Sequence, residues 1–447
     1  MNRRNRTHTL TGMISAGALM LLTGAAYAET AEAAEAVARE ADVAVEATAS
    51  REESSVEVLV IYAGKVTTMD ADDRVINNAV VVVEDGKIAE VRKAKGFEQP
   101  EGATVIDARD SWLVPGIVEL HNHTAGALRD LNDSVYLTNP GLRTLEIVAP
   151  DTDEVRRAQY GGVTTAMLIP GSGTNISGFG TLVKMGGGTS VDDVVMRAPG
   201  SLKIAQAGNP EGYWYGVGRS YMNYNTRQTL ERAKAYHEAW EAFENGETDV
   251  EPEFSIVFED FRGLFAREYP ATVHTQAFQL VMTTIDMLAV KMGIRVVLDH
   301  STIGAFRTAQ LVSEAGEENI ITMVGPRALY FDRMDRRIFG EVARWHLGGV
   351  NRLGINTDAP VVPQEELPNQ AALAVWLGWE PYKALRGLTI VGAEAAMAED
   401  RVGSIEVGKD ADMCVWTGNP VDPTSWVKTT IVEGEVVFDA ERDGRRF

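Results

Sequence analysis

The chain of 447 residues contains a single cysteine, Cys414. One cysteine cannot form a disulfide within the chain, and it cannot supply a cluster of thiolate ligands. Any metal site must therefore use histidine, carboxylate or lysine side chains. Histidine is also scarce, with seven residues in the whole sequence.

Positively charged residues are in deficit as well. The sequence holds 42 lysines and arginines against 64 aspartates and glutamates, which gives a net charge of -22. Nucleic acid and anionic lipid surfaces repel such a chain at long range, so we expect neither as a partner. A small-molecule or dipeptide substrate, neutral or zwitterionic, fits this charge better. The sequence does not fix the oligomeric state, and a homo-oligomer stays open.

The first 28 residues have the pattern of a signal peptide. Three arginines precede an apolar stretch, and 26-AYA-28 is typical of a cleavage site. We therefore predict export to the periplasm or the medium, with no membrane attachment after cleavage. An uncleaved membrane anchor is the alternative. Residues 29–56 are rich in alanine and glutamate and are predicted to form a spacer.

The two ends of the remaining chain share a β-rich pattern. Short runs such as 77-NNAVVVVEDGKIAEVRK-93 and 428-KTTIVEGEVVFD-439 are interrupted by Asp-Gly or Glu-Gly turns. This pattern predicts one small β-sandwich domain built from residues 57–115 and 401–447. The middle of the chain would then be an insertion between its halves.

The middle, residues 116–400, alternates short apolar runs with longer helical stretches, as a parallel βα fold requires. The eight runs are 116–123, 162–171, 179–187, 201–209, 271–276, 294–302, 319–326 and 350–360. Eight parallel strands in a segment of this length predict an α/β fold of the (β/α)8 TIM-barrel type. The active site of such a barrel lies at the C-terminal ends of its strands.

Histidines and an aspartate stand at these predicted strand ends. In 112-WLVPGIVELHNHTAG-126, His121 and His123 are two residues apart, so both side chains point to one face of a strand and can bind one ion. The other strand ends carry His274, His300 and Asp358. Because neutral imidazole is the commonest metal ligand, the pattern predicts a metal site.

Six segments follow one another in a fixed order along the chain. They are 115-PGIVELHNH-123, 161-GGVTTAMLIPGSG-173, 201-SLKIAQAGNPE-211, 297-VLDHST-302, 356-NTDAP-360 and 402-VGSIEVGKDADMCVW-416. In this order and spacing they resemble the amidohydrolase superfamily, and within it the imidazolonepropionase-like and prolidase-like branch. The resemblance extends from about Val58 to Asp439, which is nearly the whole chain after the spacer.

The resemblance implies a hydrolase with two divalent metal ions, usually zinc, bridged by a carbamate that CO2 forms on a lysine of the fourth strand. By this match Lys203 carries the carbamate and bridges the ions. The two sets of terminal ligands would be His121, His123 and Asp358 for one ion, and His274 and His300 for the other. Burial beside cations lowers the pKa of a lysine and supplies the neutral amine that the reaction with CO2 needs. Lys184 is the second candidate for this lysine.

The activity implied is hydrolysis of a carbon–nitrogen bond in a small cyclic amide or a dipeptide. A hydroxide that bridges the metals would attack the carbonyl, with Asp358 as the general acid and base. Tyr213, Trp214 and Tyr215 follow the fourth run and are candidates for an aromatic lid that binds substrate. A packed surface loop is the other interpretation of this aromatic segment.

Other functions are kept as alternatives. A deaminase or an imidazolonepropionase-type hydrolase with a single metal would not need Lys203. A non-catalytic barrel protein would bind no metal tightly. A serine hydrolase is not favoured, because Ser172 lies in 170-PGSGT-174, which lacks the Gly-x-Ser-x-Gly elbow of such enzymes.

Overall fold

The computed structural model describes residues 57–206, 209–213, 217–334 and 336–445. The predicted signal peptide, 1–28, and the predicted spacer, 29–56, lie outside these residues. Among the residues that are described, no helix combines the length and the apolar character that crossing a membrane would need.

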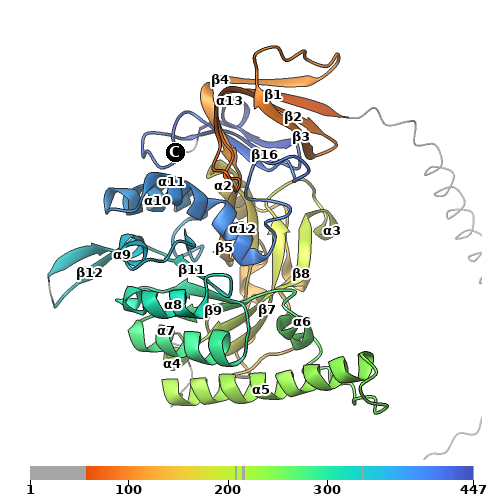
Figure 1. Ribbon diagram of the computed structural model, residues 1–447, viewed down its shortest axis with the longest axis vertical. Coiled ribbons are helices and arrows are strands. Elements are labelled where there is room, and N and C mark those ends of the chain that lie inside the picture. The colour runs from red at the N-terminus through yellow and green to blue at the C-terminus, as the bar shows by residue number, and fades with distance from the viewer. Residues whose placement is uncertain (1–56, 207–208, 214–216, 335, 446–447) are drawn as a thin grey trace, which may run out of the picture. The chain divides into compact units, whose positions relative to one another are not determined.

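Both ends of the described chain supply strands to one seven-stranded sheet, in the order β17-β16-β15-β4-β1-β2-β3. Its strands are β1 (Val58–Thr67), β2 (Val75–Glu84), β3 (Lys87–Lys93), β4 (Thr104–Pro115), β15 (Met413–Trp416), β16 (Val427–Val432) and β17 (Glu435–Asp439). Figure 1 shows the orange N-terminal strands beside the blue C-terminal ones. These strands form one continuous sheet, so the two-sheet sandwich predicted from the sequence is not confirmed.

A hydrophobic cluster holds this end sheet together, and it draws on both ends of the chain. Ile61, Val81 and Leu113 come from the N-terminal strands, while Met413 and Ile431 come from the C-terminal ones, and all five are buried. Burying one such side chain contributes about 1.5 to 3 kcal/mol. The chain from Glu57 onward forms one compact unit. The domain boundaries predicted near residues 115 and 400 therefore stay a prediction.

A second sheet of eight strands forms a nearly closed barrel, in the order β14-β11-β10-β9-β8-β7-β6-β5. Its strands are β5 (Ile117–Asn122), β6 (Val163–Leu168), β7 (Ile176–Lys184), β8 (Val195–Ala205), β9 (Ala271–Thr275), β10 (Val296–His300), β11 (Ile320–Val324) and β14 (Leu353–Ile355). The two edges meet where Asn122 forms a bridge with Ala359, and the His123 N–H donates to the Ala359 carbonyl over 3.1 Å. Each predicted run overlaps one of these strands.

The direction of one strand, β7, differs from the prediction of eight parallel strands. β7 pairs antiparallel with β6 and also with β8, whereas the other neighbouring strands of the barrel pair parallel. The link from Leu168 to Ile176 is too short for the crossover of a dozen or more residues that a parallel connection needs. The chain therefore turns back directly, and the prediction was wrong for this strand.

Helices pack against the barrel strands and bury their outer faces, which is why most of these strands lack polar alternation. The α-helices are α2 (Asp153–Tyr160), α3 (Val191–Val194), α4 (Asn209–Tyr213), α5 (Arg219–Glu244), α6 (Phe261–Phe265), α7 (Phe278–Thr284), α8 (Ala309–Ala315), α9 (Glu341–Leu347), α10 (Leu367–Trp376), α11 (Pro381–Leu388), α12 (Ile390–Ala396) and α13 (Ala440–Asp443). The 3-10 helices are η1 (Leu128–Asp130), η2 (Thr144–Ile147), η4 (Ala305–Thr308) and η5 (Gln364–Glu366), and η3 (Ile285–Lys291) is a π-helix. The strands β12 (Leu329–Asp332) and β13 (Arg337–Gly340) form a hairpin.

Candidate metal centre

The register of neighbouring strands brings the predicted polar residues onto one side of the barrel sheet. In the parallel pair β8 and β9, Lys203 lies opposite Thr272, and Ala205 lies opposite His274. In the next pair, His274 lies opposite Asp299 of β10. Side chains alternate along a strand, and cross-strand partners share a face. Lys203, His274 and Asp299 therefore project to the same side.

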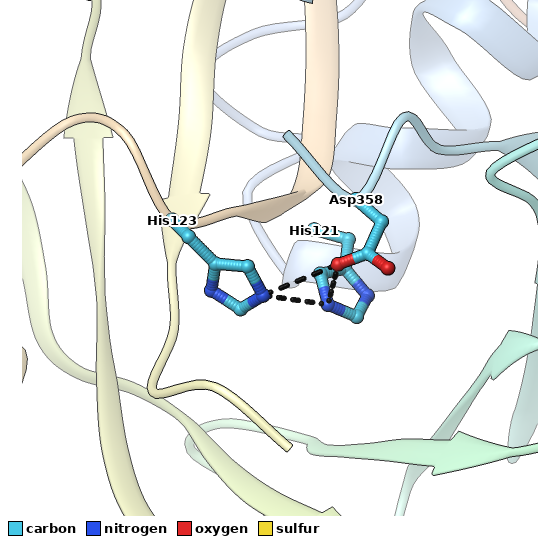
Figure 2. A group of neighbouring side chains, drawn as sticks. All are labelled: His121, His123 and Asp358. Atoms are coloured by element: carbon cyan, nitrogen blue, oxygen red, sulfur yellow. Dashed lines mark hydrogen bonds and ion pairs between the residues drawn. The ribbon is translucent and has the colours of Figure 1, made fainter. Parts of the chain in front are cut away.

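His121 and His123 leave the end of β5 toward the same point, as the spacing of the pair predicted. Their Nε2 atoms lie 3.1 Å apart, and the Nε2 atoms lie 3.0 Å and 3.3 Å, respectively, from Oδ1 of Asp358. Figure 2 shows the two rings and the carboxylate turned toward one another. These three side chains could hold one ion, because their ligand atoms all lie within 4.8 Å of one another.

Two of the side chains reach this point through an unusual backbone. The φ angle is 66° at His300 and 53° at Asp358, both in the left-handed region that residues other than glycine rarely adopt. Such conformations are held by the surrounding structure and gather at functional sites. The turn of the chain at His300 brings its ring within 4.6 Å of the His121 ring and 4.3 Å of the His274 ring, between centroids.

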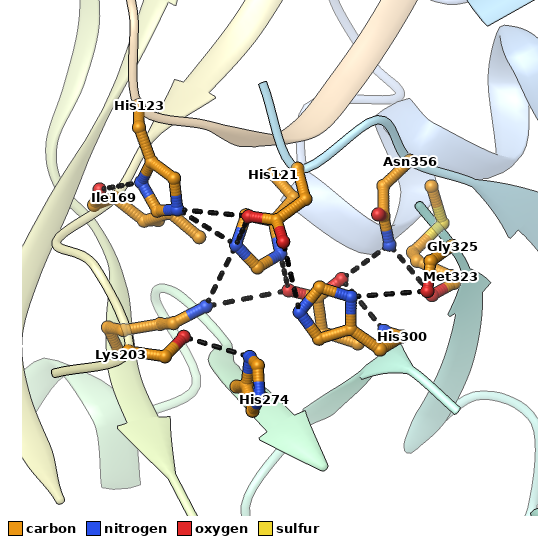
Figure 3. A network of polar contacts seen from close by, with 12 residues as sticks. His121, His123, Ile169, Lys203, His274, His300, Met323, Gly325 and Asn356 are labelled. Carbon is orange, nitrogen blue, oxygen red and sulfur yellow. Dashed lines mark hydrogen bonds and ion pairs between the residues drawn. The ribbon is translucent and has the colours of Figure 1, made fainter. Parts of the chain in front are cut away.

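All four histidines use the Nδ1 atom for an outer contact. The Nδ1 of His123 lies 2.8 Å from the Ile169 carbonyl, and that of His300 lies 3.2 Å from the Gly325 carbonyl. The Nδ1 of His274 lies 2.8 Å from the Ser172 hydroxyl, while that of His121 contacts the Asp299 carboxylate. Figure 3 shows the contacts of His123 with Ile169 and of His300 with Gly325. Nδ1 is therefore held from outside, and Nε2 is left as the ligand atom of each ring.

This donor set fits a metal ion. Protein ligands of zinc commonly bind through one ring nitrogen while the other donates to a carbonyl or carboxylate. The Nε2 of His300 is buried and has no hydrogen-bond partner among the described residues, which a bound ion would correct. Burial lowers the pKa of His123, His274 and His300, that of His300 to about 4, which favours the neutral rings that ligands must be. His121 differs, because the carboxylates of Asp299 and Asp358 outweigh its burial and raise its pKa to about 9, so a bound ion would have to displace a proton from this ring.

Lys203 lies in the centre of the same cluster and is fully buried. Its Nζ atom lies 3.4 Å from the Nε2 of His121 and 3.6 Å from Oδ2 of Asp299. Burial lowers the pKa of this lysine from its ordinary value, although the two nearby aspartates oppose the shift. Lys203 is thus a buried lysine beside a ring nitrogen and a carboxylate, and both its bridging role and its carbamate stay predictions.

Asp358 is the side chain of the cluster that solvent reaches most easily. Its exposed fraction is 18%, against 10% for His123 and none for His121 or His300. Burial by itself would raise the pKa of Asp358, but the charge of His121 and the hydrogen bonds from His121 and His123 hold it far below the usual range. A substrate would therefore approach an ionised carboxylate.

Several residues of the centre were not predicted from the sequence. Asp299 contacts His121, and its other oxygen accepts from the Asn356 amide over 2.7 Å. Glu119 is buried beneath the histidine pair, where it accepts from the His121 N–H over 2.9 Å and from the Thr357 hydroxyl over 2.8 Å. An acidic residue within an apolar strand must find partners when buried, and this was the available signal.

Lys184 lies elsewhere, and the structure does not support it as the bridging lysine. β7 is antiparallel to β6, so Lys184 lies opposite Thr165, near the start of β6 rather than near its end. Its Nζ atom is 2.8 Å from an Oδ2 atom of Asp410 and of Asp412. The direction of β7 thus removes Lys184 from the cluster that contains Lys203.

The aromatic lid stays a prediction. Tyr213 is the last residue of α4, and Trp214 and Tyr215 lie outside the described residues.

Comparison with known proteins agrees with this geometry. Residues 342–437 match the amidohydrolase family. The chain is 24% identical over 408 residues to the amidohydrolase tasK of Hapsidospora irregularis, a match that covers 80% of this chain and 40% of the relative. It is also 24% identical over 388 residues to an imidazolonepropionase of Sphingopyxis alaskensis, a match that covers 80% of this chain and 91% of the relative. A dihydroorotase of Anaeromyxobacter dehalogenans is 37% identical over 114 residues, but this match spans only 22% of the relative.

Solved structures show the same fold. An amidohydrolase from Thermotoga maritima aligns with a TM-score of 0.72 and 26% identity, over 85% of this chain and 100% of the other. A Xaa-Pro dipeptidase aligns with a TM-score of 0.52 and 18% identity, over 85% of this chain and 99% of the other. Fold, centre and matches together define the class of this protein. The family match, the relatives and the solved structure from Thermotoga maritima support the amidohydrolase superfamily, and with it a hydrolytic enzyme, as the motifs indicated.

Proposed function

We propose that this protein is a metal-dependent amidohydrolase that cleaves a carbon–nitrogen bond in a small cyclic amide or a dipeptide. The observation that carries the proposal is the shared orientation of four imidazole rings. Each holds Nδ1 against an outer partner and leaves Nε2 for the centre. A fold that needed these histidines only for packing would have no reason to orient all four alike.

In this proposal the centre would hold two divalent ions, zinc in the first instance. His121, His123 and Asp358 would be the ligands of one ion, His274 and His300 those of the other, and Lys203, as a carbamate, would be a ligand of both. When bound, such ions polarise a substrate carbonyl and lower the pKa of water toward neutrality. The position of Lys203 supports a bridging role, because its Nζ lies 3.4 Å from a ligand nitrogen in a fully buried setting.

Asp358 is the residue that handles protons in the proposed reaction. Its carboxylate is ionised and is the most accessible of the cluster, so it can accept a proton from the attacking water. The same carboxylate then returns the proton to the nitrogen of the leaving group. An amine leaves poorly without that proton, so hydrolysis of an amide needs a general acid such as Asp358 on the side of the centre that solvent reaches.

The substrate class rests on the relatives. The similarity to an imidazolonepropionase covers most of both chains, and the fold is shared with a Xaa-Pro dipeptidase. Both names denote hydrolysis of a carbon–nitrogen bond in a compact substrate. The predicted export would place this hydrolysis outside the cytoplasm, where a dipeptide or a small cyclic amide is available for salvage.

The test is a substrate screen on zinc-reconstituted protein, with dipeptides and small cyclic amides assayed for release of amine or carboxylate. We expect a hydrolysed substrate whose turnover is lost on chelation, returns with zinc and falls by at least about a thousandfold in Asp358→Asn. Asp286→Asn, which changes a surface aspartate with 55% exposure, is the matched control and should keep full activity. Zinc-loaded protein that turns over purine or pyrimidine amines alone would replace this proposal with a deaminase.

A further inference from the structure

Asp299 is not among the predicted ligands, although it lies close enough to His121 and His300 to share an ion with them. It is fully buried at the end of β10, and its Oδ2 atom contacts the Nδ1 of His121. Its Oδ1 atom accepts a hydrogen bond from the Asn356 amide over 2.7 Å. The carboxylate thus lies between the amide of Asn356 and the Nδ1 side of the His121 ring, and its Oδ2 atom also lies 3.6 Å from the Nζ of Lys203.

The direction of these hydrogen bonds follows from Asn356. Its Nδ2 also lies 3.0 Å from the Met323 carbonyl, which can only accept. The amide group of Asn356 must therefore point its two N–H bonds at Met323 and at Asp299. One oxygen of Asp299 is occupied as an acceptor, and the other contacts the Nδ1 of His121, from which it would accept if that nitrogen carried the proton.

We infer that Asp299 is a positioning residue that, together with Asn356, fixes the tautomer of His121. With the proton held on Nδ1, the lone pair of Nε2 faces His123 and Asp358, where the proposed metal binds. A carboxylate on the outer nitrogen also makes a ligand histidine more basic, and loss of such a partner lowers metal affinity about 10- to 100-fold. This inference rests on the proposed function and adds a residue to it.

An asparagine at position 299 gives a sharp test, because it keeps the shape of the side chain. In Asp299→Asn the Asn356 amide still needs an acceptor, so the new amide turns its N–H bonds toward His121. The Nδ1 of His121 must then accept, its proton moves to Nε2, and the lone pair that would bind metal is blocked.

The reciprocal exchange should restore the tautomer. In Asp299→Asn with Asn356→Asp, the carboxylate at 356 accepts from the amide at 299, whose oxygen again accepts from His121. Recovery is expected to be partial, since a carboxylate at 356 loses its hydrogen bond to the Met323 carbonyl. A ligand role for Asp299 predicts no recovery, because the exchange does not return an oxygen ligand to position 299.

The experiment measures zinc affinity of the full chain by competition with a chromophoric chelator, for the wild type, both variants and the surface control Asp286→Asn. Urea unfolding of each metal-free protein accompanies it, to show that the variants fold. We expect a 10- to 100-fold weaker Kd in the single variant, recovery of at least half of that loss on a logarithmic scale in the double variant, and no change in the control.

The outcomes separate the two claims. Wild-type protein that binds no zinc would overturn the proposed function and this inference with it. Wild-type protein that binds zinc while Asp299→Asn binds equally well would overturn only the inference. A double variant as weak as the single one would assign Asp299 to direct ligation or to packing instead of to the tautomer of His121.

Discussion

Replacing Lys184 by methionine should lower the stability of the protein and leave its metal content unchanged. The Lys184 ammonium is buried, and it lies 2.8 Å from Asp410 and 2.8 Å from Asp412, whose side chains are at most 1% exposed. Breaking a buried ion pair by removing one partner costs about 3 to 5 kcal/mol, since a charge is left without compensation. The variant leaves both carboxylates in place.

The structure places the effect near the lower end of that range. Asp410 keeps its contacts with Arg401 and Lys87, and Asp412 keeps the Glu433 N–H at 2.9 Å. We therefore expect a loss of about 3 kcal/mol in the free energy of unfolding, or roughly a hundredfold in the unfolding equilibrium. Urea unfolding followed by circular dichroism measures this loss.

Lys87→Met is the matched control, because Lys87 contacts the same Asp410 but is 53% exposed. An exposed pair contributes at most about 1 kcal/mol, so this variant should unfold close to the wild type. Zinc content of the folded Lys184→Met protein should equal that of the wild type. The reasoning is refuted if Lys184→Met loses metal, or if it unfolds no more easily than Lys87→Met.

Three further changes have defined outcomes. Ser172→Ala removes the hydroxyl that lies 2.8 Å from the His274 Nδ1 and should weaken zinc binding about tenfold or more, as measured by competition with a chelator. Unchanged zinc affinity would show that the hydroxyl does not orient the His274 ring. Gly116→Ala should lower the free energy of unfolding by about 1 to 3 kcal/mol, because a Cβ at this position would lie 2.0 Å from the Oγ1 of buried Thr164. A urea midpoint equal to that of the wild type would contradict this close contact. Burial raises the pKa of Glu341 from 4.5 to about 7, so the folded state binds the Glu341 proton more tightly than the unfolded state does. The stabilisation that this bound proton gives the folded state is lost as pH rises from about 4.5 through 7. Glu341→Gln should flatten that fall between pH 5 and 8, and a variant with the same pH slope as the wild type would rule out Glu341 as its source.

The sequence located the barrel strands well, but it did not show the direction of β7. Apolar runs have the same composition whichever way they point, so periodicity alone could not separate the two orientations of residues 176–184. The length of the link did carry the information, because eight residues or fewer cannot form a crossover. Reading that link correctly would also have decided between the two lysines, since the direction of β7 takes Lys184 away from the centre.

The proposed ligands could be picked out from the sequence because they are histidines at strand ends, and the structure brings these side chains together with Lys203 and Asp358. Their outer partners were harder to see. Ile169 and Gly325 contribute backbone carbonyls, which have no sequence signature. Asp299 did have one, because a charged residue in 296-VVLDH-300 must be paired when it is buried, but its partner comes from a strand almost 180 residues away.

The central claim is that four histidines, Asp358 and Lys203 form a binuclear metal centre. Elemental analysis of protein purified without chelators, in parallel with Lys203→Ala and Lys184→Met, tests it most directly. The account predicts close to two zinc or similar divalent ions per chain in the wild type and in Lys184→Met, with a clear fall in Lys203→Ala. One ion per chain that persists in Lys203→Ala, or no ion in any of the three proteins, would contradict it.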